Sequence, residues 1–159
     1  MTVVLTLTPD LATLYAAAFP DEDLVPLLQG LSGQPGTLSL IEGSPPVAHV
    51  LFTLGQINGA KVALLGPAAV HPDRQGQGLG SRLIRQGIAH LGETGVAMVL
   101  VLGDPAYYGR FGFLPETGAE PPCPIPEDWR PAWQSLVLTQ PHRGRLSLPA
   151  PWLSQDLWR

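Results

Sequence analysis

One stretch of the sequence, residues 61–102, changes its hydrophobic period twice and so restricts the fold more than any other. Residues 61–70 are mostly apolar, as in a buried strand, and residues 96–102 form a second, continuously apolar run. Between these runs, apolar residues mark one face of a helix that Gly92 ends: Leu79, Leu83, Ile84, Ile88 and Leu91. Strand, helix and strand in this order predict a parallel pair joined by a right-handed crossover.

The rest of the chain is predicted to form short elements, because 18 glycines and 18 prolines interrupt it. Asn58-Gly59 is a strong signal for a hairpin turn before the strand at residues 61–70. The other predicted strands are residues 3–7, 37–42, 47–57 and 133–138. The other predicted helices are residues 9–18, 20–30 and 104–108.

The chain has 159 residues, about the length of one domain, and 45% of them are hydrophobic, enough for one core. We expect a single domain over residues 1–159, with its core in residues 3–138 and a proline-rich tail at residues 139–159. No apolar run approaches the ~20 residues of a membrane helix. Residues 1–20 hold no Lys or Arg, so we expect no secretory signal and a cytoplasmic location.

Charge and cysteine content argue against several classes of partner. The net charge of −4 lacks the basic footprint of a nucleic-acid-binding protein. Cys123 is the only cysteine, which excludes an internal disulfide and a cysteine-based zinc site. The histidines and carboxylates form no cluster in the sequence that is typical of metal ligands. We therefore expect no nucleic acid, membrane or metal as a partner.

A glycine-rich segment, residues 74–80 (Arg-Gln-Gly-Gln-Gly-Leu-Gly), lies between the strand and the helix of the crossover. Glycines let the backbone approach a ligand closely, and the N–H groups at a helix start favour an anion. The segment is not a Walker A loop, which needs Gly-Lys-Ser/Thr, nor a dinucleotide fingerprint, since Ser81 takes the third glycine position. Arg74, Arg82 and Arg85 against Asp73 also favour an anion. A tight turn beside a solvated helix face is the alternative interpretation.

Two motifs at a suitable separation carry a family resemblance. Residues 75–80 (Gln-Gly-Gln-Gly-Leu-Gly) match the pattern Q/R-x-x-G-x-G/A, and residues 103–113 contain Tyr108 in a Tyr-x-x-x-Gly-Phe pattern. The first resembles the acyl-coenzyme A (acyl-CoA) signature of the GNAT N-acetyltransferases, and the second is similar to their small bacterial YhbS-like branch. The resemblance implies an α/β GNAT fold. In that fold a mixed sheet, antiparallel at its start, is splayed between two central parallel strands and has helices on both faces.

The resemblance also implies an activity and a set of site residues. The expected reaction moves an acetyl group from acetyl-CoA directly to a primary amine of a small molecule or protein. A backbone N–H near Val70 is the candidate oxyanion donor, and Tyr108 is the candidate catalytic residue, as general acid for the departing thiolate. The expected cofactor-binding residues are Ala68, Ala69, Val70, Gln75, Gly76, Gln77, Gly78, Leu79, Gly80 and Ser81.

Two chemical assignments stay open at this level. The general base is Glu42, His49, His71 or a chain of water molecules. Asp104 precedes a proline at a predicted helix start, so we expect it to cap that helix rather than to act in the chemistry.

The function and the assembly have alternatives too. A non-catalytic acyl-CoA-binding or sensor module would use the same glycine loop without turnover. Monomer and homodimer are equally compatible with the sequence. The tryptophans of the carboxy-terminal part either line an aromatic pocket or dimer contact, or pack onto the core: Trp129, Trp133 and Trp152.

Overall fold

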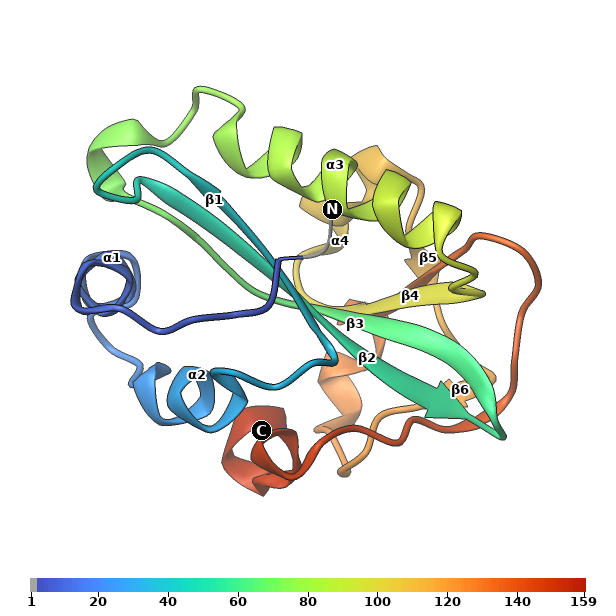
Figure 1. Ribbon diagram of the computed structural model, residues 1–159. Helices are drawn as coiled ribbons and strands as arrows, with labels where there is room; N and C mark the ends of the chain where they lie inside the picture. Colours follow the sequence, from blue (N-terminus) through green and yellow to red (C-terminus); the bar gives the residue numbers. More distant parts are fainter. Residues whose placement is uncertain (1–2) are drawn as a thin grey trace. The chain divides into compact units, whose positions relative to one another are not determined.

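The computed structural model describes residues 3–159 (Figure 1). These residues form two compact units. The first unit comprises the chain up to Phe52 together with Gly66–Ile88. The second comprises Thr53–Leu65 and Ala89–Arg159. Among residues 3–159, no helix has the length and apolar content needed to cross a membrane.

The first unit begins with two short helices, α1 (Pro9–Ala18) and α2 (Val25–Leu31). The Thr8 hydroxyl accepts a hydrogen bond from the Leu11 N–H and so caps α1, which starts at a proline as predicted. The start of α2 differs from the prediction, because the helix begins at Val25 rather than at residue 20. The Val25 N–H donates a hydrogen bond to the Asp23 carboxylate at 3.2 Å.

The strand predicted at residues 3–7 is wrong. Leu5 is fully buried, but its N–H donates to the Thr37 hydroxyl at 2.9 Å, and the Leu7 N–H donates to the Ser32 hydroxyl at 2.9 Å. Side-chain hydroxyls therefore accept the hydrogen bonds of N–H groups that would otherwise donate to a neighbouring strand. The apolar alternation anchors this segment in the core without making it a strand.

The main sheet has six strands in the order β1-β2-β3-β4-β7-β5. They span β1 (Thr37–Glu42), β2 (Ala48–Ile57), β3 (Ala60–Val70), β4 (Met98–Leu102), β5 (Leu114–Pro115) and β7 (Trp133–Val137). Strand β3 runs parallel to β4, with Ala63 opposite Val99, whereas β7 is antiparallel to both β4 and β5. The sheet is therefore mixed, and the parallel pair predicted from residues 61–102 is confirmed.

The turn before β3 and the helix after it form where the sequence predicts them. The helix does not end at Gly92 as expected, because it continues to Glu93, and the glycine with positive φ that follows it is Gly95 (85°). Asn58 and Gly59, between β2 and β3, both have positive φ (49° and 82°), as a tight hairpin turn requires. A short 3₁₀ turn, η1 (Pro72–Arg74), follows β3, and the long helix α3 (Leu79–Glu93) begins directly after the glycine loop. In Figure 1 this order is followed from the green strand through the loop into the yellow-green helix.

The second unit contains many short elements after β4. Helix α4 (Pro105–Tyr108) runs into η2 (Gly109–Phe111), and a small parallel sheet pairs β6 (Ala119–Glu120) with β8 (Gly144–Arg145). The remaining elements are the 3₁₀ turns η3 (Glu127–Ala132), η4 (Ala150–Leu153) and η5 (Gln155–Trp158).

Tryptophans form the centre of the second unit. Trp133, Trp152 and Trp158 are buried, and the ring centroid of Trp158 lies 6.0 Å from that of Trp133 and 6.1 Å from that of Trp152. Each indole N–H donates to an oxygen, for example that of Trp152 to the Thr53 hydroxyl at 3.0 Å. Trp133 and Trp152 therefore pack in the core, whereas Trp129 remains 37% exposed.

Gly87 of α3 packs closely against residues from strands of the first unit. A Cβ atom at Gly87 would overlap the Phe52 ring and come within 3.0 Å of Leu40. Gly92, near the end of the same helix, has no atom within 4 Å of the equivalent position. The two glycines therefore differ in packing although both are helical.

We predict that Gly87→Ala lowers the free energy of unfolding by about 1–3 kcal/mol, since overpacking outweighs the better helix propensity of alanine. The matched variant Gly92→Ala should raise stability by up to about 1 kcal/mol, because only propensity changes there. Urea unfolding of both variants measures this difference. Equal effects of the two substitutions would contradict the close packing at Gly87.

Candidate functional site

The last five residues of β3 form one side of the candidate site in the first unit. Gly66, Pro67, Ala68 and Val70 are half-buried, whereas Ala69 is only 1% exposed. The following N–H, that of His71, donates to the Val47 carbonyl at 2.8 Å and fixes the end of this strand. A proline and two small side chains leave the backbone of this segment open to a ligand.

The glycine loop that follows has the backbone geometry expected of an anion cradle. Gly76 and Gly78 have φ of 77° and 76°, and a Cβ at either position would meet no atom within 4 Å. Both residues are exposed, whereas Leu79 is buried and starts the 15-residue helix α3. The loop thus presents unobstructed backbone at a helix start, a geometry that fits a pyrophosphate.

Side-chain hydrogen bonds connect residues within this loop and connect the loop to the end of β3. Arg74 Nε donates to Gln77 Oε1 at 3.1 Å, and Gln75 Nε2 lies 3.4 Å from the Val70 carbonyl oxygen. The partner of Arg74 in this bond is a neutral amide, so the contact leaves its positive charge uncompensated. The structure therefore brings the predicted loop residues and the strand residue Val70 together.

Arg82 and Glu42 form an ion pair between α3 and β1. Their side chains are 51% and 41% exposed. The pairing reduces the local positive charge that the sequence suggested around the loop. It also makes Glu42 a poorer candidate for the general base, because its carboxylate is already engaged with the Arg82 guanidinium.

Three buried side chains of the first unit, Ser39, His49 and Tyr15, form a hydrogen-bonded group that we call the His49 network. His49 Nε2 lies 2.8 Å from the Ser39 hydroxyl, and Nδ1 lies 2.7 Å from the Tyr15 hydroxyl. The Tyr15 hydroxyl in turn donates to the Pro67 carbonyl at 3.3 Å. The sequence pointed to His49 but not to Ser39 or Tyr15, which lie in two other segments of the chain.

Burial controls the protonation of the His49 network. It lowers the pKa of His49 from 6.5 to about 4, and it raises the pKa of Tyr15 well above its usual value. His49 is fully buried and both of its ring nitrogens have partners. Such an imidazole is neutral near pH 7 and enclosed, so it is poorly suited to act as the general base.

His71, the remaining histidine candidate, lies directly after β3. Its Nδ1 accepts a hydrogen bond from the Asp73 N–H at 3.1 Å and so caps η1. The side chain is 37% exposed. One ring nitrogen therefore has a structural task, and the imidazole keeps access to solvent.

Tyr108 belongs to the second unit and ends α4. Its ring packs edge-on against Phe113, with centroids 5.9 Å apart, and a Cβ at Gly103 would overlap it. Burial, with a smaller contribution from Tyr107, raises the pKa of Tyr108 from 10.0 to about 12. The phenol therefore keeps its proton at neutral pH, as a general acid must.

Asp104 has the structural role expected from the sequence. Its carboxylate accepts a hydrogen bond from the Ala106 N–H at 2.9 Å and caps α4. This cap holds the short helix that carries Tyr107 and Tyr108.

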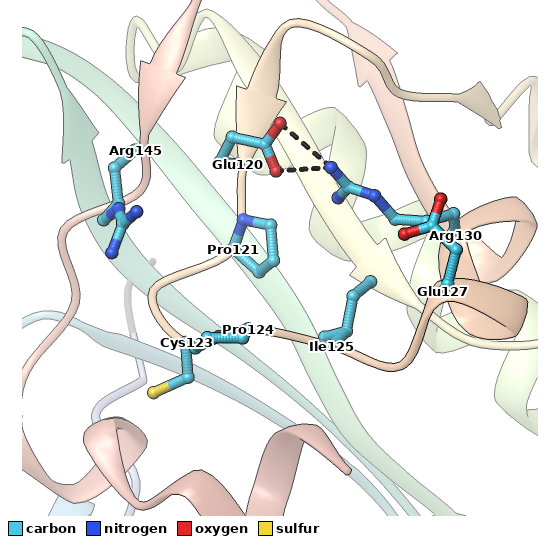
Figure 2. A pocket seen from close by; sticks show the side chains of 8 residues that line it. All are labelled: Glu120, Pro121, Cys123, Pro124, Ile125, Glu127, Arg130 and Arg145. Atoms are coloured by element: carbon cyan, nitrogen blue, oxygen red, sulfur yellow. Dashed lines mark hydrogen bonds and ion pairs between the residues drawn. The ribbon is translucent and has the colours of Figure 1, made fainter.

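A pocket of ≈ 260 Å³ that the sequence did not suggest lies in the second unit (Figure 2). It is lined by Glu120, Pro121, Cys123, Pro124, Ile125, Glu127, Arg130 and Arg145. In Figure 2 the Arg130 guanidinium reaches both carboxylate oxygens of Glu120, at 2.8 and 3.0 Å. The volume is slightly below the ~300–1,000 Å³ of typical small-molecule sites, and the best-placed charges already neutralise each other.

Comparison with known proteins identifies the family. Residues 47–115 match the family model of the acetyltransferase (GNAT) domain. Over 135 residues the chain is 39% identical to the uncharacterized N-acetyltransferase YjhQ of Escherichia coli K12, covering 80% of the chain and 70% of YjhQ. The chain belongs to the GNAT acetyltransferase family. A shorter region, 69 residues, is 41% identical to the uncharacterized N-acetyltransferase YhbS of the same strain and covers 41% of YhbS.

Solved structures support the same assignment for this GNAT protein. The E. coli YhbS structure in complex with CoA matches with a TM-score of 0.78 and 25% identity, over 92% of this chain and 86% of that one. A Brucella melitensis GNAT acetyltransferase in complex with acetyl-CoA matches with a TM-score of 0.66 and 25% identity, over 94% and 96%. The predicted GNAT fold is confirmed, as are the class of acetyl-CoA-dependent N-acetyltransferases and its cofactor.

We predict that the lowered pKa of His49 makes stability fall on acidification. Below pH 6.5 the unfolded chain protonates this imidazole, whereas the folded protein resists until about pH 4. Unfolding free energy should therefore drop by about 2–3 kcal/mol more between about pH 7.5 and pH 4.5 in wild type than in His49→Gln.

Urea denaturation of both proteins at the two pH values checks this difference. The other titrating groups are the same in both proteins, so they cancel in the comparison. An equal drop in wild type and variant would show that His49 titrates normally.

Proposed function

We propose that this GNAT protein transfers the acetyl group of acetyl-CoA directly to a primary amine of a small molecule or protein. Membership of the family supports the reaction class. The observation that carries the proposal is the open loop at Gly76 and Gly78, whose backbone is unobstructed immediately before α3. In this proposal residues 1–159 act as one acetyltransferase domain.

The proposed cofactor contacts follow the geometry of the first unit. Backbone N–H groups of residues 75–81 would bind the pyrophosphate, since they begin a long helix and no side chain covers Gly76 or Gly78. The strand residues Ala68, Ala69 and Val70 would bind the pantetheine arm by backbone hydrogen bonds. Arg74, on the same loop, adds positive charge.

We predict that Gly78→Glu weakens acetyl-CoA binding at least about tenfold more than Gly78→Gln. Both side chains strain the same positive-φ position equally, but only glutamate places a negative charge beside the pyrophosphate. Isothermal titration with acetyl-CoA and with CoA measures the two affinities. Equal affinities of the two variants, or no binding by wild type, would refute the proposed site.

The chemical step requires an oxyanion donor and an acid. Bound acetyl-CoA supplies the activated acetyl group, which a neutral amine attacks as the carbon–sulfur bond breaks. A backbone N–H near Val70 would stabilise the oxyanion that forms during this attack. Tyr108 would give its proton to the departing sulfur as the bond breaks. Its raised pKa ensures that the phenol still carries this proton when the cofactor binds.

The proton of the attacking amine needs an acceptor. His49 is enclosed and weakly basic, and Glu42 is paired with Arg82. These observations favour His71 or a chain of water molecules as the base, because His71 retains solvent access.

We predict that Tyr108→Phe lowers kcat by about 10²-fold and leaves acetyl-CoA affinity near that of wild type, since only the acidic proton is lost. Tyr107→Phe removes the neighbouring hydroxyl and serves as the matched control, with kcat within about twofold of wild type. Amine-dependent thiol release measures both rates, once an accepted amine has been found by screening.

The pKa of Tyr108 adds a second test. Because the phenol is half ionised only near pH 12, Tyr108 should cause no alkaline loss of kcat below about pH 10. An unchanged rate in Tyr108→Phe would remove the acid role. Cofactor binding without turnover of any amine would favour a non-catalytic acyl-CoA-binding module.

A further inference from the structure

The His49 network has no task in the chemistry proposed above, although it occupies the interior of the first unit. Its three members come from α1, β1 and β2, and their exposures are 2% for Tyr15, 3% for Ser39 and 0% for His49. Burying three polar side chains is costly unless each is hydrogen-bonded. Their common end point is the Pro67 carbonyl of β3.

One arrangement of protons satisfies the whole network. The Tyr15 hydroxyl has a single proton and donates it to Pro67, so it accepts from the Nδ1–H of His49. Nε2 is then unprotonated and accepts from the Ser39 hydroxyl. Ser39, His49 and Tyr15 thus each donate to the next group in the chain, which ends at β3. Successive hydrogen bonds in such a chain polarise one another.

The network is closed at its far end. Ser39 is buried in β1, and each nitrogen of His49 has one partner. A proton path needs an outlet to solvent or substrate, and this arrangement offers none through Ser39. The geometry of the network therefore suits the orientation of a backbone carbonyl rather than a proton relay.

We propose that Tyr15 is a positioning residue that holds the Pro67 carbonyl and thereby fixes the strand segment 67–70 for the pantetheine arm of acetyl-CoA. His49 holds the Tyr15 hydroxyl through Nδ1, and Ser39 provides a hydrogen-bond partner for the other nitrogen of the same buried imidazole. The inference rests on the proposed function, because it assumes that this segment binds the arm. It adds a determinant of cofactor affinity that touches neither the cofactor nor the acceptor.

The experiment compares two ligands on the full-length protein by isothermal titration. Acetyl-CoA contains the pantetheine arm, whereas adenosine 3′,5′-bisphosphate contains only the nucleotide part. Tyr15→Phe keeps the ring and its packing against Phe19 but removes the hydroxyl. It should weaken acetyl-CoA about tenfold and change the affinity for the bisphosphate less than about twofold.

Ser39→Ala is the matched control within the same network. It also removes one buried hydroxyl, but it leaves the Tyr15 hydroxyl and its bond to Pro67 in place. Its affinity for acetyl-CoA should stay within about threefold of wild type. If Tyr15→Phe does not fold, the double variant Tyr15→Phe/His49→Leu is tested with the same expectation. Its second substitution removes the buried imidazole that Tyr15→Phe would leave without a partner.

The remaining outcomes overturn the inference. Equally weakened binding of both ligands in Tyr15→Phe would indicate general damage to the fold. An unchanged affinity for acetyl-CoA would show that the Pro67 carbonyl does not need the hydrogen bond from Tyr15. Equal losses in Tyr15→Phe and Ser39→Ala would indicate a purely structural network. Wild-type protein that binds neither ligand would refute the proposed function itself, and this inference with it.

Discussion

The start of a helix directs backbone N–H groups out of the helix, and the proposed cofactor site of the first unit depends on that property of α3. Glycines at 76 and 78 keep the approach to these groups free of side chains. Gly87, in the middle of the same helix, lets it pack tightly against Phe52. The helix can therefore offer a rigid set of donors to an anion.

Side-chain charge contributes less to this site than the sequence suggested. Of the arginines near the loop, Arg82 is paired with Glu42, whereas Arg74 donates to a neutral amide within the loop. The backbone therefore supplies most of the proposed recognition. The proposed acid role of Tyr108 rests on desolvation instead, since burial raises the pKa of its phenol and keeps it protonated.

Much of the fold was predictable because the local sequence patterns of residues 61–102 agree with the structure. The hydrophobic period and the turn residues of this stretch both indicate a single strand–helix–strand crossover. The segment at residues 3–7 failed because Thr37 and Ser32 hydroxyls take N–H bonds that periodicity assigns to a strand. The His49 network was invisible for another reason. Its members lie 10 and 34 residues apart, so only the folded chain brings them together.

Hydrogen–deuterium exchange with and without acetyl-CoA tests the central claim most directly, because it reports on the backbone groups that are proposed to bind the cofactor. Saturating acetyl-CoA should slow exchange in residues 75–81 and in the strand segment 66–70, with little change at the exposed hairpin turn around Gly59. Saturation that leaves both segments unchanged would contradict the account and place the cofactor elsewhere.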